Sequence, residues 1–198
     1  ASAWSDSRAG ALWNFSACFT YWRSFSKGNM GPYLTQSIHA LNAVEIENSI
    51  SEGCMARNLS NLTIVEYNAE RGKEWYMSSL RIRSDVTLRD PDVVILNEMD
   101  IGMARSGNLH TTRMLAYALH MNYAFGVEFI ELTAGTLAEI SATSGHSNTL
   151  SLHGNAILSK CKLFSPKIFR DPLDEDYFSD DVSGAKLRSG RVGEKRLG

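Results

Sequence analysis

The clearest pattern in the sequence is a pair of short apolar stretches in the first half of the chain. The run Val93–Leu96 is β-branched and aliphatic, is preceded by Pro-Asp, and is typical of a strand buried on both faces. In residues 62–68, LTIVEYN, apolar and polar residues alternate enough to predict another strand. The polar stretch 69–73 leads out of this strand. The segment from 74 to 88 is weakly periodic and predicts a helix that crosses from one strand to the next.

Further elements follow this pair of strands. Residues 123–132, YAFGVEFIEL, alternate with period two and predict a strand whose wetter face carries Glu128 and Glu131. Thr111 is placed to cap the helix that precedes this strand. The stretch 154–159, GNAILS, predicts one more strand. Strands that alternate with helical segments indicate a mixed α/β (α+β) fold.

A polar insertion lies between the last two predicted strands. Residues 133–148 are rich in Thr, Ser, Gly and Ala, which favours a loop with room for a helical turn. Leu137 and Ile140 are its few apolar anchors. His146 is interpreted as a solvated loop residue, because no second ligand stands at metal spacing.

Residues 1–57 look unlike the rest of the chain. Aromatic residues crowd the segment from Trp4 to Phe25, and apolar residues from 33 to 50 recur at spacings near three and four, which predicts an amphipathic helix. We therefore expect an N-terminal extension at 1–57 that precedes a domain at 58–198. Two interpretations stay open, because aromatic enrichment marks both cores and interfaces: the extension packs on its own domain, or it docks against a protein partner.

Composition narrows the class of protein only a little. A chain of 198 residues with 43% hydrophobic residues permits one domain with a substantial core. Its net charge of −2 and pI of about 6.2 give no global basic excess that would require nucleic acid as a partner. Cys18, Cys54 and Cys161 are widely spaced, which predicts free thiols and favours an intracellular or organellar location over secretion. No apolar run approaches the ~20 residues of a membrane span, so a soluble or peripheral protein is expected.

Glu98 is the first candidate for chemistry. It closes the apolar run that begins at Val93, at the C-terminal edge of the predicted sheet, where layered α/β folds bind ligands. Position alone favours a merely solvated acid, because most exposed carboxylates have no further role.

Four blocks in order change this interpretation: VEYNAERGK at 65–73, VVILNEMDIGMARSGNLH at 93–110, YAFGVEFIEL at 123–132 and LHGNAILSK at 152–160. Together they resemble the endonuclease/exonuclease/phosphatase (DNase-like) superfamily of metal-dependent phosphoesterases. The resemblance covers about residues 59–198 and implies the N-terminal half of a four-layer α/β sandwich.

The resemblance also assigns residues. It implies that Asn68 and Glu98 lie together at a metal site, with Glu98 as the ligand of Mg²⁺. It places His153 and Asn155 beside the phosphate of the substrate, while a hydrogen-bonded structural imidazole is the alternative for His153. We expect the strands 63–68 and 93–97 to be adjacent and parallel, because the crossover between them is long enough to carry a helix.

The implied function is hydrolysis of a phosphodiester or phosphomonoester. The superfamily's later motifs, an Asp-x-Asn and a terminal Asp-His, do not occur in residues 1–198. The resemblance therefore stops in mid-domain, and we expect the chain alone to be inert and to need a partner that covers its N-terminal aromatics and its exposed inner sheet face. The alternative is a non-catalytic structural subunit built on a degenerate phosphoesterase fold.

Overall fold

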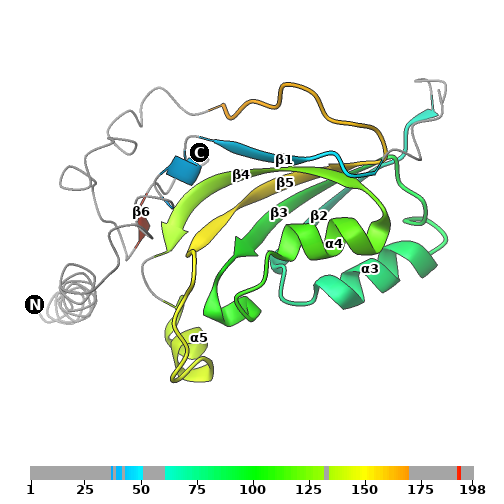
Figure 1. Ribbon diagram of the computed structural model, residues 1–198. Coiled ribbons are helices and arrows are strands. Elements are labelled where there is room, and N and C mark those ends of the chain that lie inside the picture. The colour runs from blue at the N-terminus through cyan, green and yellow to red at the C-terminus, as the bar shows by residue number, and fades with distance from the viewer. Residues whose placement is uncertain are drawn as a thin grey trace, which may run out of the picture.

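A computed structural model describes residues 37, 39–41, 43–50, 61–131, 134–169 and the backbone of 191–192. Its elements in chain order are β1 (Val44–Glu47), β2 (Ile64–Arg71), α3 (Trp75–Ser84), β3 (Val93–Ile101), the 3₁₀ turn η2 (Ala104–Ser106), α4 (Thr111–Leu119), β4 (Asn122–Glu131), α5 (Leu137–Ala142), β5 (Leu152–Ser159) and β6 (Arg191–Val192). Figure 1 shows a mixed α/β arrangement in which α3 and α4 lie on one face of a single sheet. The mixed α/β class predicted from the sequence is therefore confirmed.

The strands follow the order β1-β4-β5-β3-β2, and β6 pairs with β4. β2 and β3 are parallel, with Ile64 opposite Val93 and Asn68 opposite Asn97. Helix α3 connects them, as a parallel pair requires. The predicted parallel pairing of these two strands is thus confirmed. β5 pairs antiparallel with both β3 and β4, so the block 152–160 lies in the middle of the sheet.

The hydrophobic core lies between the sheet and α4. Leu96 of β3, Leu158 of β5 and Phe125 of β4 are buried at 0%, 0% and 1% exposure, and they pack with Leu115 of α4. Side chains alternate between the two faces along a strand. The buried residues named here lie on one face of the sheet, which is the face that the helices cover. Helix α3 is less apolar than α4, and its buried residues are Ser78, Ser79 and Ile82.

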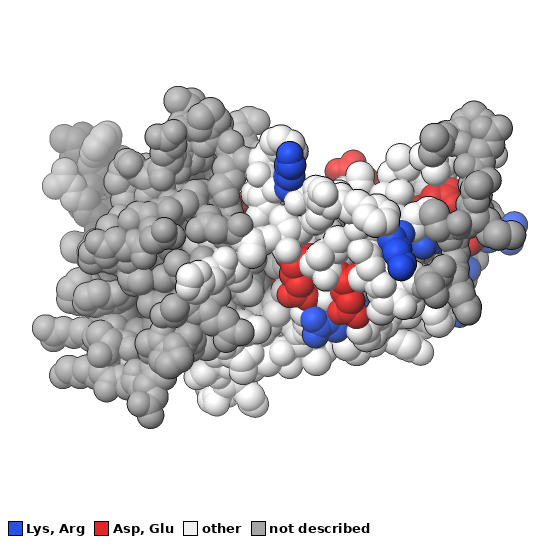
Figure 2. Space-filling model, turned by 45° about the horizontal axis from the view of Figure 1, so that its top comes forward, with Lys and Arg blue, Asp and Glu red and all other residues white. Residues whose placement is uncertain are grey.

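The opposite face of the sheet is open by comparison. Ile64 and Ile157 are 57% and 45% exposed, respectively. Residues 166–169 line part of this face, and between them and strands β1, β3, β4 and β5 lies a groove of about 350 Å³. Figure 2 shows that much of the described surface in that view is uncharged, with a few acidic and basic side chains close together near its centre. Within the described residues, no helix has the length and apolar character needed to cross a membrane.

The helix predicted from 33 to 50 is wrong over its second half. Ser37 and residues 39–41 are helical, but Val44–Glu47 is strand β1, which pairs antiparallel with β4. Part of the segment assigned to an N-terminal extension therefore belongs to the sheet. The predicted run of aromatics from Trp4 to Phe25 lies outside the described residues.

Three predictions about single side chains also need correction. Glu131 does not lie on a wetter face, because it is only 2% exposed. The N-cap of α4 is His110, whose side chain accepts a hydrogen bond from the Arg113 amide, and Thr111 is the first helical residue. Cys161 is disulfide-bonded, so the prediction of a free thiol at this position is wrong.

The two apolar residues predicted to anchor the polar insertion do not do so. Leu137 and Ile140 of α5 are 82% and 42% exposed, so neither anchors the loop. The helical turn itself is present, and Thr136 and Glu139 form a capping box at its start. His146 is exposed, as predicted.

A close approach of β4 and β5 gives the first testable prediction. A Cβ added at Gly154 would lie 2.0 Å from the Gly126 carbonyl oxygen, and backbone cannot give way as a flexible side chain can. Gly154→Ala is expected to lower the free energy of unfolding by about 1–3 kcal/mol or more, because the two strands must separate.

Gly126→Ala is the matched control, since its Cβ would meet only the Ile168 side chain, at 3.4 Å. Denaturant midpoints of the two variants decide the matter. Equal midpoints would contradict the strand pairing around Gly154.

Candidate functional site

The predicted residues Asn68, Glu98 and Asn155 gather where the ladders on both sides of β3 are irregular. The register shifts between Leu96 and Met99 against β5, and on the β2 side between Asn68 and Arg71. Glu98 lies in this irregularity with a φ of 58°, a conformation that costs energy for a residue with a Cβ. Such bulges re-aim side chains and are frequent beside functional sites.

Hydrogen bonds fix these three residues. The Asn68 side-chain amide donates to Glu98 Oε1 at 3.1 Å, and the Glu98 backbone amide donates to Asn155 Oδ1 at 3.3 Å. Asn68 Oδ1 in turn accepts from the Glu70 amide at 3.0 Å, which sets the orientation of the Asn68 amide group. The prediction that Asn68 and Glu98 reach the same edge of the sheet is thereby confirmed.

Arg71 belongs to the same cluster and was missed by the sequence analysis. Its Nη1 donates to Glu98 Oε2 at 2.6 Å, with 19% of the Arg71 side chain and 35% of the Glu98 side chain exposed. Arg71 follows Asn68 by three residues at the end of β2. The only feature of the sequence that pointed to Arg71 was its position in the polar stretch 69–73, which follows the predicted strand.

His153 lies deeper than the other predicted residues. Its side chain is 3% exposed, and its Nδ1 is 2.7 Å from Asp100 Oδ1. Its ring lies against Phe129, with 4.6 Å between the ring centroids. This arrangement is that of the hydrogen-bonded structural imidazole, the alternative considered for His153.

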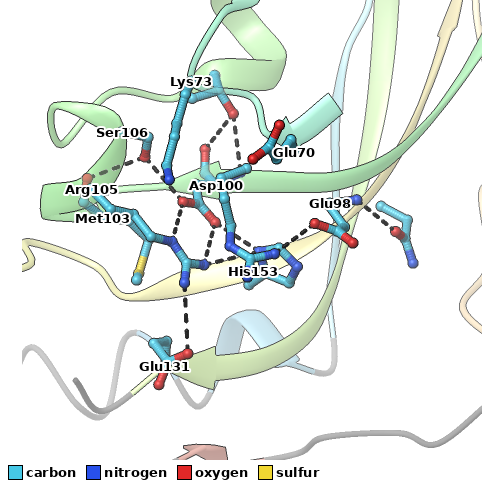
Figure 3. Close-up of polar contacts among 12 residues, drawn as sticks. Glu70, Lys73, Glu98, Asp100, Met103, Arg105, Ser106, Glu131 and His153 are labelled. Atoms are coloured by element: carbon cyan, nitrogen blue, oxygen red, sulfur yellow. Dashed lines mark hydrogen bonds and ion pairs between the residues drawn. The ribbon is translucent and has the colours of Figure 1, made fainter. Parts of the chain in front are cut away.

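Asp100 and Arg105 form a buried ion pair beside His153 (Figure 3). The Arg105 Nε and Nη2 atoms donate to the two Asp100 oxygens at 2.8 and 2.9 Å, and the Ser106 hydroxyl donates to Asp100 at 3.1 Å. Burial opposes ionisation of the Asp100 carboxyl, but hydrogen bonds from Arg105 and His153 outweigh it, so the Asp100 pKa lies below its usual value.

Glu139 of α5 connects this ion pair to the candidate site. Its Oε1 accepts from Lys73 Nζ at 2.9 Å and lies 3.5 Å from Arg71 Nε, and its Oε2 lies 3.7 Å from Arg105 Nη1. Burial alone would raise the Glu139 pKa, but the Thr136 amide, Lys73 and Arg105 together lower it to about 2. Glu139 is therefore a carboxylate at neutral pH.

A separate polar cluster ties β1 to α4. Glu45 Oε1 lies 2.8 Å from His110 Nε2, and it accepts hydrogen bonds from Tyr123 at 2.6 Å and from Arg113 at 3.0 Å. Burial opposes ionisation of Glu45, but its hydrogen bonds and the charges of His110 and Arg113 lower its pKa from the usual 4.5 to about 2. The cluster therefore adds side-chain contacts to the backbone pairing of β1 with β4.

This cluster predicts an acid-dependent stability. Because the pKa of Glu45 is lower in the folded chain, its contribution is present above the unfolded value of 4.5 and is lost as the pH falls toward about 2. We expect the denaturant midpoint to fall over that window, with a shallower fall in Glu45→Gln. Denaturation curves recorded between these pH values test this, and identical slopes for the two chains would refute it.

The fit of the site to Mg²⁺ is limited. Among the described residues, no group of three or more His, Cys, Asp or Glu side chains could hold a metal ion. Mg²⁺ nevertheless keeps several waters and commonly uses one or two carboxylates together with substrate phosphates. The partly exposed Glu98 carboxylate fits such a one-carboxylate site, provided that Arg71 shares it.

Comparisons with known proteins add no assignment. No protein-family model, no curated protein and no solved structure matches the chain. The support for a function therefore consists of the geometry around Glu98 and the four sequence blocks.

Proposed function

We propose that this chain is the N-terminal half of a magnesium-dependent phosphoesterase of the endonuclease/exonuclease/phosphatase type. The contact between Asn68 and Glu98, made at the adjoining ends of two parallel strands, carries the proposal. Ligands of layered α/β folds bind at such strand ends. Ile64 and Ile157 are exposed on the face of the sheet opposite α3 and α4, and this supports a fold in which a second sheet packs there, as the proposed four-layer sandwich requires.

Each residue of the site has a role in this proposal. Glu98 would hold Mg²⁺, which, when bound, offsets charge on the phosphoryl oxygens and lowers the pKa of a bound water. The Asn68 amide carries both a donor and an acceptor and orients the scissile phosphate. Asn155 fixes the strained backbone at Glu98, to which it is hydrogen-bonded. Arg71 brings a guanidinium group within reach of an anionic substrate.

The second candidate function is a structural subunit. The Arg71–Glu98 ion pair favours it, because a guanidinium at 2.6 Å already satisfies one oxygen of the proposed metal ligand. In a non-catalytic chain, this pair would simply tie β2 to β3. A partner protein would then cover the open face of the sheet, where Ile64 and Ile157 are exposed.

A hydrolysis assay separates the two functions. Residues 1–198 are expected to show no Mg²⁺-dependent cleavage of an activated phosphodiester, because groups that act as one unit lose most of their effect when any is missing. A longer form of the chain that contains the acid and histidine motifs is expected to cleave it and to lose activity with a chelator. A longer form that stays inert with Mg²⁺ would favour the structural subunit, and cleavage by residues 1–198 alone would overturn the proposed position of the active site.

A further inference from the structure

We infer that Lys73, Arg71 and Arg105 form an anion-binding subsite, which the Glu139 carboxylate fills in this structure and a phosphate group of the substrate takes over. This inference rests on the proposed function and deepens it, because it assigns a second anionic group to the substrate. It needs α5, the helix that carries Glu139, to move aside.

The cations come from separate parts of the fold and converge on one carboxylate. Lys73 follows β2, Arg71 ends it, and Arg105 lies in η2, yet all three have nitrogen atoms within 3.7 Å of Glu139. Figure 3 shows Lys73 and Arg105 in the same polar cluster as Glu98. Arg71 is also paired with Glu98, and Arg105 with Asp100 and Glu131, but Glu139 is the carboxylate that all three cations share.

The carboxylate also leaves donors unused. Within the described residues, Arg71 Nε and Arg105 Nη1 are buried and have no hydrogen-bond partner, although each lies within ion-pair distance of Glu139. Buried N–H groups without acceptors are unfavourable, and the Arg105 side chain is only 1% exposed. A phosphate group has more oxygen atoms and more charge than a carboxylate, so it can accept from these donors at the same time.

Helix α5 is weakly attached apart from Glu139. It has no buried residue, and Leu137 is 82% exposed. The loop before it fits closely over the carboxylate, since a Cβ at Gly135 would lie 2.2 Å from Glu139 Oε2. Burial of apolar surface contributes little to the position of α5, so an anion that competes for the cations has little else to overcome.

The subsite also adjoins the candidate metal ligand. Arg71 donates to Glu98 through Nη1 and faces Glu139 through Nε. In a complex with phosphate at Arg71 Nε, only the Arg71 guanidinium group would therefore separate the phosphate from Glu98. This predicts a substrate with a second anionic group beside the scissile phosphate, such as a terminal phosphate.

Binding of inorganic phosphate tests the inference without any need for hydrolysis or metal. We compare the full chain with Glu139→Gln, Lys73→Met and the exposed control Lys162→Met by isothermal titration at low salt. Gln also serves at this position of a capping box, so Glu139→Gln keeps the start of α5 while it removes the competing charge.

Phosphate is expected to bind Glu139→Gln about tenfold more tightly than the unmodified chain, and Lys73→Met about tenfold more weakly, because hydrogen bonds to charged groups are strong. Lys162→Met should bind like the unmodified chain. Equal affinity of Glu139→Gln and the unmodified chain would overturn the inference, as would a loss in Lys162→Met equal to that in Lys73→Met. If the full chain binds phosphate in this pattern but a longer form that contains the acid and histidine motifs stays inert with Mg²⁺, the proposed function alone is refuted.

Discussion

Glu98→Gln, in a longer and active form of the chain, is expected to lower turnover by about a hundredfold or more and to abolish its dependence on Mg²⁺. The amide keeps the shape of the side chain but removes the charge that a hard, oxygen-preferring cation requires. A metal ion contributes several kcal/mol to the stabilisation of a phosphoryl-transfer transition state, which is the source of this magnitude. Steady-state rates across a Mg²⁺ titration measure the effect.

The fold is expected to survive this change. The Glu98 side chain is 35% exposed, and the amide oxygen of Gln can still accept the hydrogen bond from Asn68 or Arg71. Glu66→Gln is the matched control, because Glu66 is exposed and lies two residues before Asn68 on the same strand. Unchanged Mg²⁺-dependent turnover in Glu98→Gln would leave Glu98 as one half of a structural ion pair.

The pattern of apolar residues predicted the central strands well, and it failed at β1 for a physical reason. Val44 and Ile46 alternate with Glu45 and Glu47, which is the period of a strand. The same residues also extend the helical spacing of the segment before them. Pairing with β4 decided between the two periods, and that contact spans more than seventy positions of the sequence.

The resemblance implies that Asn68 and Glu98 lie together, and the parallel pairing of β2 and β3 accounts for it, because parallel strands bring their carboxyl ends to one edge. The rest of the cluster could not be predicted. Arg105 and Glu139 meet only through the folding of η2 and α5 against each other. An isolated Arg or Glu in a polar stretch is usually solvated, so sequence alone favours the wrong environment for both.

Glu131 was assigned to the wrong face for a simpler reason. It follows Phe129 by two residues, so period two places it on the face of Phe129 and not on the face of Glu128. Glu131 is 2% exposed, with Arg105 Nη1 at 3.8 Å. The alternating pattern of β4 gives no sign of this cation, because Arg105 comes from η2.

Asp100→Ala is expected to cause the largest loss of stability in the described part of the chain, about 3–5 kcal/mol, because it leaves a buried guanidinium without its main partner. The side chains of Asp100 and Arg105 are 0% and 1% exposed. A typical domain is stable by only about 5–15 kcal/mol, so this variant would be close to unfolding. Urea denaturation of the full chain, followed by circular dichroism, gives the free energies of unfolding.

A graded comparison separates the ion pair from ordinary packing. Ser106→Ala removes one hydrogen bond to Asp100 and is expected to cost about 1 kcal/mol, which is typical of a single bond. The exposed Asp85→Ala is the control and should leave the free energy of unfolding nearly unchanged, since its partner is the neighbouring Thr87. A loss in Asp100→Ala no larger than in these two variants would mean that Arg105 finds enough compensation in Glu131 and Glu139. In that case the two glutamates, and not Asp100, would balance the charge buried beneath the candidate site.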